Sequence, residues 1–149
     1  MHYLIYTAID WGLIYFFVGK KFFKLWQTAL IGLAIVIAAD YFGIKYNLFY
    51  YTKGLIYIGN QPLFALINAF ANCVIYLNWL PTEWGKRIAY TAYASVLLTA
   101  VEAAMYSVGA IQYPHWKLWY SYFLLNAGLL LMVYLSEILK VSPHNNTKD

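Results

Sequence analysis

Apolar residues occur in five long runs along this chain, and short polar or basic segments separate them. The runs cover residues 3–18, 25–44, 62–80, 88–108 and 118–139. A helix needs about 20 consecutive, mostly apolar residues to cross the roughly 30 Å hydrocarbon core of a membrane. The pattern therefore predicts an all-α integral membrane bundle of about five transmembrane helices. We expect a single domain over residues 1–149 that ends in a polar tail at 140–149.

The composition supports a membrane protein and excludes an ordinary soluble domain. Of the 149 residues, 63% are hydrophobic and only 11% are charged, whereas charged residues make up about a quarter of a typical soluble domain. The net charge of +4 comes from Lys and Arg residues between the apolar runs, where they set topology and contact lipid headgroups. We therefore expect a multi-pass protein of the cell (cytoplasmic) membrane with membrane lipids as partners and no nucleic acid. Self-association into a homo-oligomer is left open.

The basic residues also predict how the bundle is oriented, because cytoplasmic connections carry an excess of Lys and Arg. If the N-terminus lies outside, seven basic residues fall on the inner side: Lys20, Lys21, Lys24, Lys86, Arg87, Lys140 and Lys148. Only three fall on the outer side: Lys45, Lys53 and Lys117. We therefore expect the N-terminus outside and the C-terminus inside.

Polar side chains share one face of the predicted helix at 88–108. They recur at spacings of four, four, three and four residues: Thr91, Ser95, Thr99, Glu102 and Tyr106. Such a face turns towards other helices rather than towards lipid. Hydroxyl and amide groups in membranes often do no more than join helices, at roughly 0.6 kcal/mol per hydrogen bond. On their own they therefore indicate helix packing rather than a functional site.

Three acids, Asp10, Asp40 and Glu102, lie well inside the apolar runs, with no Lys or Arg at similar depth. A carboxylate at mid-bilayer costs roughly 2.5 to 3.5 kcal/mol, so it needs partners or a wet cavity. At about 1.5 Å per residue, Asp40 and Glu102 fall in the outer half of the membrane and Asp10 near its middle. The candidate polar cavity comprises Asp40, Glu102, Asn68, Asn126, Tyr106 and Asp10. Acids that are hydrogen-bonded to Asn and Tyr purely for packing would explain the sequence equally well.

An aromatic loop precedes the last predicted helix. Tyr113, His115 and Trp116 are candidate contacts for a headgroup or a substrate on the outer side. A lone His without a second ligand at metal spacing does not indicate a metal site, and with Cys73 as the single cysteine a Cys-based metal cluster is excluded. We expect no metal and no cofactor, and no motif assigns a catalytic residue.

Several residues from about position 40 onward follow a family pattern: Asp40, the segment 81–87, Glu102, Gly109, Ile111, Tyr113, Trp116 and Ser121. In these positions the chain resembles a family of uncharacterised small multi-pass membrane proteins of endospore-forming Gram-positive bacteria. That resemblance implies a bacterial membrane protein and supports the topology. It implies no reaction, because no activity is established for the family.

A weaker likeness involves the segment 40–45, the aromatic pair Phe49 and Tyr50, and Pro62 at the start of the next run. In these residues the chain is similar to the lycopene cyclase domain of carotenoid synthesis, which implies an enzyme that acts on an isoprenoid. That domain has acids just after its proline, whereas this chain has Leu63 and Phe64. The departure removes the acids expected to protonate the olefin.

The sequence thus supports three functions. The leading prediction is a non-catalytic membrane protein that binds a lipid or another amphiphile in the polar cavity of the outer half. An alternative is an enzyme that acts on an isoprenoid lipid, with Asp40 or Glu102 as general acid. The second alternative is a proton-coupled transporter in which the same acids form a relay, although the chain shows no obvious inverted repeat.

Overall fold

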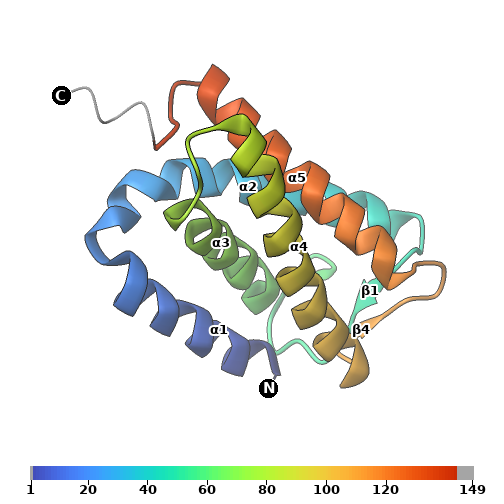
Figure 1. Cartoon of the computed structure of the whole chain (residues 1–149). Coiled ribbons are helices and arrows are strands. Elements are labelled where there is room, and N and C mark those ends of the chain that lie inside the picture. Colours follow the sequence, from blue (N-terminus) through green and yellow to red (C-terminus); the bar gives the residue numbers. More distant parts are fainter. Residues whose placement is uncertain (1, 144–149) are drawn as a thin grey trace.

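The computed structural model is a bundle of helices (Figure 1). Its α-helices are α1 His2–Leu13, α2 Phe22–Lys45, α3 Leu63–Asn78, α4 Trp84–Ser107 and α5 Leu118–Ile138. The prediction of a mainly helical bundle is therefore confirmed. The loop after α2 and the loop after α4 meet at one end of the bundle. The structure describes residues 2–143, so that residue 1 and residues 144–149, with Lys148 among them, lie outside the described part.

Helices α1 and α2 are joined without a loop. A π-helical turn, Ile14–Val18, and a 3₁₀ turn, Gly19–Lys21, continue the helical path between them, and we call the segment 14–21 the elbow. The path bends sharply there (Figure 1). Gly19 has a φ of 51°, a positive value that glycine adopts without steric cost and other residues avoid. The elbow therefore turns the chain without interrupting the helical stretch.

The predicted number of five transmembrane helices is wrong. Within residues 2–143, three helical stretches are long and apolar enough to cross a membrane: His2–Lys45, Trp84–Ser107 and Leu118–Ile138. The 12 residues of α1 extend only about 18 Å, and the 16 residues of α3 extend about 24 Å. Both lengths fall short of a hydrocarbon core roughly 30 Å thick. Three long apolar helices nevertheless indicate a multi-pass protein located in a membrane.

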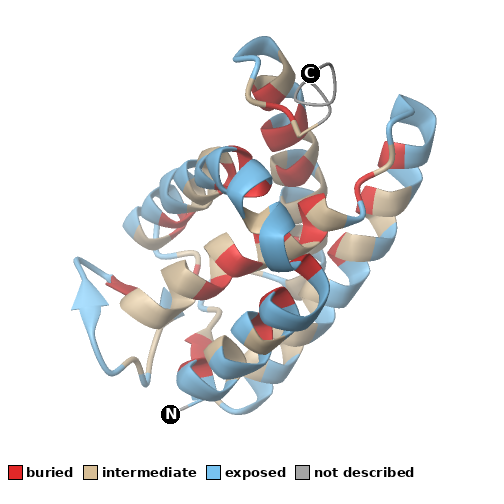
Figure 2. Cartoon of the chain, turned by 90° about the vertical axis from the view of Figure 1, so that its left-hand side faces the viewer, coloured by how far each residue is buried: buried red, intermediate tan, exposed pale blue. Residues whose placement is uncertain are grey.

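The outer faces of the helices are apolar. Figure 2 shows that exposed residues cover the outside of the bundle while buried residues face inward. Among the exposed residues are large aromatic side chains, such as Phe16 at 80%, Tyr15 at 78% and Phe23 at 77% exposure. An apolar surface of this extent would cost free energy in water and contacts lipid in a membrane. The surface thus supports the membrane location that the helix lengths indicate.

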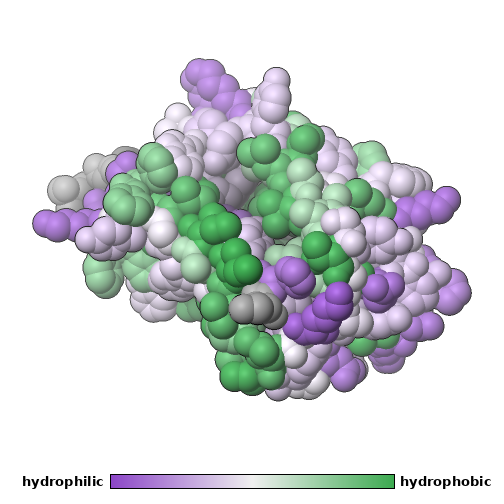
Figure 3. All heavy atoms as spheres, turned by 90° about the horizontal axis from the view of Figure 1, so that it is seen from below, coloured by the Kyte–Doolittle hydropathy of each residue, from purple (hydrophilic) through white to green (hydrophobic). Residues whose placement is uncertain are grey.

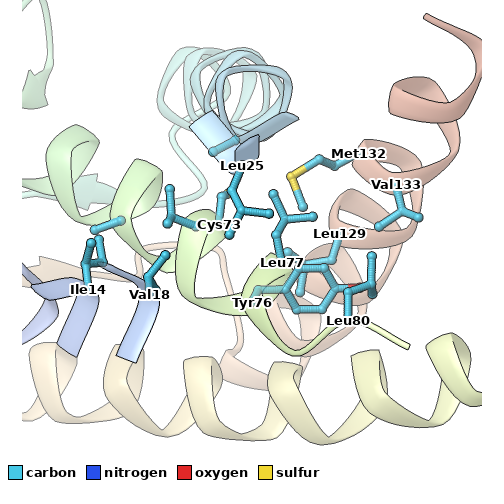
Figure 4. Close-up of a cluster of buried hydrophobic side chains, with 13 residues drawn as sticks. Ile14, Val18, Leu25, Cys73, Tyr76, Leu77, Leu80, Leu129, Met132 and Val133 are labelled. Atoms are coloured by element: carbon cyan, nitrogen blue, oxygen red, sulfur yellow. The ribbon is translucent and has the colours of Figure 1, made fainter. Parts of the chain in front are cut away.

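The core lies where α3 packs against the elbow, α2 and α5. Figure 4 shows the side chains that converge there: Ile14, Val18, Leu25, Cys73, Tyr76, Leu77, Leu80, Leu129, Met132 and Val133. At Gly32 of α2, an added Cβ would lie 2.5 Å from Cys73 Sγ and 2.5 Å from Met132 Sδ. Only glycine therefore lets α2 approach both α3 and α5 this closely.

Short strands organise the loops at the end of the bundle where α2 ends and α5 begins. β1, Tyr50–Tyr51, pairs antiparallel with β4, Ile111–Gln112, while β2, Tyr57–Ile58, pairs antiparallel with β3, Gln61–Pro62. The β1–β4 pair joins the loop after α2 to the loop after α4. Two segments about 60 residues apart in the sequence are thus held together at this end.

Further hydrogen bonds strengthen this junction. The amide of Thr52 donates to the carbonyl oxygen of Ala110 at 2.8 Å, and Nζ of Lys53 donates to that of Val108 at 2.6 Å. The hydroxyl of Tyr3 also donates to Ala110 O, at 2.7 Å. The start of α1 therefore lies at the same end as the two loops.

An ion pair joins α4 to α5 at the opposite end. Nη1 of the buried Arg87 contacts Oε1 of Glu137, and the guanidinium group lies 5.0 Å from the ring centroid of Trp84. A buried cation needs such partners, because an unpaired charge in an apolar setting is costly. This end therefore carries its own polar cluster, separate from the loop junction.

Candidate functional site

A cavity of about 240 Å³ lies inside the bundle, towards the end with the loop junction. All five α-helices and both long loops contribute to its wall. Most of the wall is apolar, with side chains such as Ile35 of α2, Leu98 of α4 and Leu125 of α5. Polar side chains gather on the wall near the loops, and Asp40 and Glu102 are among them. Both acids therefore lie on the inside of the bundle.

Asp40 lies five residues before the end of α2 and is 8% exposed. The hydroxyl of Tyr51, on β1, donates to its Oδ2 at 2.8 Å. Tyr51 reaches the carboxyl group because the chain folds back after α2, where the ring of Phe49 packs against Gly43. An added Cβ at Gly43 would lie 2.3 Å from Phe49 Cε1, so this fold of the loop requires glycine.

Glu102 lies on α4 and accepts two hydrogen bonds on one oxygen. The hydroxyl of Tyr113 donates to Oε1, and the hydroxyl of Ser121 donates to the same atom at 2.6 Å. Nε1 of Trp116 donates to Ser121 Oγ at 2.8 Å, which completes a chain of donors from the loop into the cavity wall. The ring of Tyr106 stacks on that of Tyr113, with centroids 4.8 Å apart, and so fixes its position.

The two acids are arranged alike. In each case the donor is a loop tyrosine 11 residues further along the chain, Tyr51 for Asp40 and Tyr113 for Glu102. Burial raises the pKa of Tyr51 well above its ordinary value, and the Asp40 carboxyl raises it further. Burial and the Glu102 carboxyl raise the pKa of Tyr113 in the same way. Both phenols therefore keep their proton at neutral pH and act as hydrogen-bond donors.

A second polar cluster joins α1 to α3 on the far wall of the cavity. Asn68 accepts a hydrogen bond from Thr7 at Oδ1, at 2.6 Å. Nδ2 of Asn72 lies 2.7 Å from the hydroxyl oxygen of Tyr6 and 3.2 Å from Asp10 Oδ2. Asn68 and Asn72 line the cavity, whereas Asp10 lies behind Asn72 and is 2% exposed. Asp10 is thus held by packing partners rather than presented to the cavity.

The structure brings together only part of the predicted cavity. Asp40, Glu102 and Asn68 line it, and Trp116 of the outer loop does so too. Three other predicted residues lie outside the lining: Asp10, Asn126 and Tyr106. Nδ2 of Asn126 donates to the carbonyl oxygen of Tyr122 one turn earlier in α5, so this amide is hydrogen-bonded within its own helix.

The remaining predicted loop contacts support the junction instead of the cavity. Tyr113 donates to Glu102 from the loop side. His115 is exposed, and its Nδ1 lies 3.1 Å from the carbonyl oxygen of Asn47. Its backbone amide donates to Leu48 O at 3.2 Å. His115 therefore ties the loop after α4 to the loop after α2, and among residues 2–143 no cluster of three His, Cys, Asp or Glu side chains could hold a metal ion.

Tyr51 and Tyr3 line the cavity although the sequence did not single them out. The chain has sixteen tyrosines, and most tyrosines of membrane proteins belong to interfacial belts. One signal in the sequence could have identified Tyr51. It follows Asp40 by 11 residues, and Tyr113 follows Glu102 by the same spacing.

In chemical terms, the site is an apolar chamber with a polar wall. Two carboxyl groups, two asparagine amides and the hydroxyls of Tyr51 and Ser121 can form hydrogen bonds with a headgroup, while the aliphatic walls suit a hydrocarbon. No model of a known protein family, no curated protein and no solved structure matches the chain. The two family resemblances seen in the sequence stay predictions.

Proposed function

We propose that the protein binds a single amphiphilic molecule of the cytoplasmic membrane in this cavity and that it does so without catalysis. The observation that carries the proposal is the position of Asp40 and Glu102 on the wall of an otherwise apolar chamber inside a membrane protein. Acids are retained inside membranes mainly where they serve a cavity, a pathway or each other. The polar head of the ligand would lie against these acids and its apolar part against Ile35, Leu98 and Leu125.

The test is a comparison of the molecules that co-purify with the protein and with a cavity-filling variant. Gly128 of α5 lines the cavity, and an added Cβ would meet only Ile35 Cγ2, at 3.6 Å. The backbone therefore tolerates Gly128→Leu, and the larger side chain occupies the cavity. The ligand then loses the space that this side chain fills, so we expect binding to weaken by roughly tenfold or more, about 1.4 kcal/mol.

The matched control is Gly12→Leu on α1, where an added Cβ meets nothing within 4 Å and the residue does not line the cavity. We expect mass spectrometry of lipid extracts to find one defined amphiphile with the wild-type protein and with Gly12→Leu. The amount should fall sharply with Gly128→Leu. Equal amounts in all three proteins, or only bulk membrane lipid, would contradict the proposal.

An enzyme that acts on an isoprenoid is a second candidate, because carboxyl groups beside an apolar chamber are suited to general acid chemistry. The same lipid extraction distinguishes catalysis from binding. An isoprenoid recovered in two forms, the second of them lost when Glu102→Gln or Asp40→Asn is introduced, would indicate catalysis. A single unchanged ligand would indicate binding.

A further inference from the structure

A groove of about 260 Å³ lies between α1 and α4 and adjoins the cavity. Three side chains, Tyr6, Val101 and Met105, line both the groove and the cavity. These shared residues form the boundary between the two spaces, so the groove and the cavity are separated by side chains rather than by a helix backbone. Figure 3 shows this face of the molecule, which is hollowed between two bands of apolar side chains.

The groove exists because α1 and α4 are not packed on each other. Helix α1 packs chiefly on α3, and α4 packs chiefly on α5. Elsewhere in the bundle, neighbouring helices are joined by close contacts such as Gly32 of α2 against Cys73 and Met132. The α1–α4 seam is therefore closed by side chains rather than by close packing of the two helices.

The outer part of the groove is apolar and faces the surroundings of the bundle. Ile5 and Ile9 of α1 are each 55% exposed, and Val108, directly after α4, is 39% exposed. Their helices belong to stretches long and apolar enough to span a membrane, so lipid hydrocarbon contacts this surface. No Lys, Arg, Asp or Glu lines the groove within the described part of the chain. His2, at the start of α1, and Tyr6 are its polar members and the other lining residues are apolar, so most of the wall suits a hydrocarbon chain.

The volumes also indicate an occupant that extends through both spaces. Binding sites for molecules of moderate size begin at about 300 Å³, and the cavity of about 240 Å³ lies just below that value. Together with the groove it falls within the usual range. A polar head would lie in the cavity near Asp40 and Glu102, with the adjoining part of the chain against Ile35 and Leu125. The rest of the chain would pass between α1 and α4.

We propose that the groove between α1 and α4 is a lateral opening through which a single-chain lipid enters the cavity from the bilayer. This inference rests on the proposed function, since it names the class of ligand and its route to the same cavity. The ligand reaches the acids without crossing water, and its chain stays in contact with Ile5, Ile9 and Val108 after binding. A molecule with two bulky chains would not fit a seam of this size.

The test uses the full chain in phosphatidylglycerol and phosphatidylcholine vesicles that contain a hexadecanol analogue with a diazirine in its chain, because a neutral hydroxyl head can donate a hydrogen bond to the carboxyl groups. After irradiation, mass spectrometry maps the labelled residues. Ile35 and Leu125 line the cavity but not the groove, so a label there reports a chain that has entered. We expect labels at these residues as well as at Ile5 and Val108.

Ala104→Trp blocks the groove, because Ala104 lines it but not the cavity. The matched control is Ala100→Trp, one turn earlier on the exposed surface of α4 and in neither lining. We expect Ala104→Trp to lower labelling of Ile35 and Leu125 roughly tenfold or more, while Ala100→Trp leaves it unchanged. Val108→Trp provides a second block if Ala104→Trp fails to fold, as judged by gel filtration.

The outcomes separate the two proposals. Undiminished cavity labelling in both groove variants would overturn the lateral opening and leave the proposed function intact. No cavity labelling even in the wild-type protein would overturn both. Gly128→Leu, which fills the cavity, should lose the labels at Ile35 and Leu125 and keep those at Ile5 and Val108. Loss of all labels in that variant would contradict the lateral opening, because the groove would then hold no chain when the cavity is filled.

Discussion

Glu102 is the residue on which the polar wall of the cavity depends most. Its Oε1 accepts hydrogen bonds from Tyr113 and Ser121, which are held in turn by Tyr106 and Trp116. Glu102→Gln keeps an oxygen acceptor of the same size at this position. Glu102→Leu leaves both donors without a partner, and an unsatisfied buried polar group costs about 1–3 kcal/mol.

We therefore expect thermal unfolding in detergent to show Glu102→Gln close to the wild-type protein and Glu102→Leu clearly less stable. The matched control is Glu83→Leu, because Glu83 pairs with Lys86 on the exposed surface, where an ion pair contributes little. If Gln destabilises the protein as much as Leu does, the carboxylate charge itself is required, and hydrogen bonding alone does not explain the site.

The sequence identified the acids but not their donors. Asp40 and Glu102 stand out because a carboxyl group inside an apolar run is rare and costly. The donors Tyr51 and Ser121 are of residue types that are common in and around membrane helices. Tyr51 reaches Asp40 through a turn of the loop and the β1–β4 pairing, a tertiary contact that has no periodic signal in the sequence.

At the scale of elements, the positions of the helices were predicted well, but the number of helices that span the membrane was not. The long apolar runs correspond to helices because backbone groups in lipid must pair within the segment. The lysines after the first run suggested a loop, but Lys20 and Lys21 lie on a helical turn that continues into α2. The elbow depends on a π-helical turn and on Gly19, and neither produces a break in hydropathy.

The ion pair between α4 and α5 offers a test at this scale. Arg87 is buried and Glu137 is 34% exposed at its side chain, and removal of one partner from a buried pair costs roughly 3–5 kcal/mol. Because Glu137 is partly solvated, we expect Arg87→Met to cost about 3 kcal/mol, at the lower end of that range.

The double variant Arg87→Met with Glu137→Leu should recover a large part of this loss, because no unpaired charge is left behind. Unfolding in detergent of the two single variants and the double variant gives the coupling energy. Additive losses would show that the two side chains act independently and that Arg87 serves mainly its contact with the Trp84 ring.

At the scale of the whole molecule, the two ends of the bundle differ in charge. One end holds the elbow, the end of α3, the start of α4 and the end of α5 (Figure 1), and the rings of Phe17 and Trp79 lie 5.9 Å apart there. The basic residues of these segments outnumber those of the loop junction. The positive-inside rule therefore favours the elbow end as the cytoplasmic one.

We expect reporter fusions after Arg87 and after Lys148 to read cytoplasmic, and one within the loop after α4, at Pro114, to read external. The N-terminus is expected on the same outer side, because Tyr3 is hydrogen-bonded to Ala110 at the loop junction. Helices α1 and α3 run between the two ends but are too short to cross the hydrocarbon core on their own. A cysteine introduced at the exposed Thr82 serves as an internal control that impermeant reagents should not reach in sealed cells. An external C-terminus would contradict this orientation.

The spacing of 11 residues between each acid and its tyrosine also bears on how the protein is made. Ribosomes add about 5 to 20 residues per second, so each carboxyl group gains its own donor within about two seconds of its synthesis. Neither acid has to wait for a distant helix before its oxygen is satisfied. The turn of the loop after α2 can bring Tyr51 to Asp40 early, and the β1–β4 pairing fixes this contact once β4 has been made. Each acid thus has a donor from the loop that directly follows its own helix, which shortens the time for which an unpaired carboxyl group faces hydrocarbon.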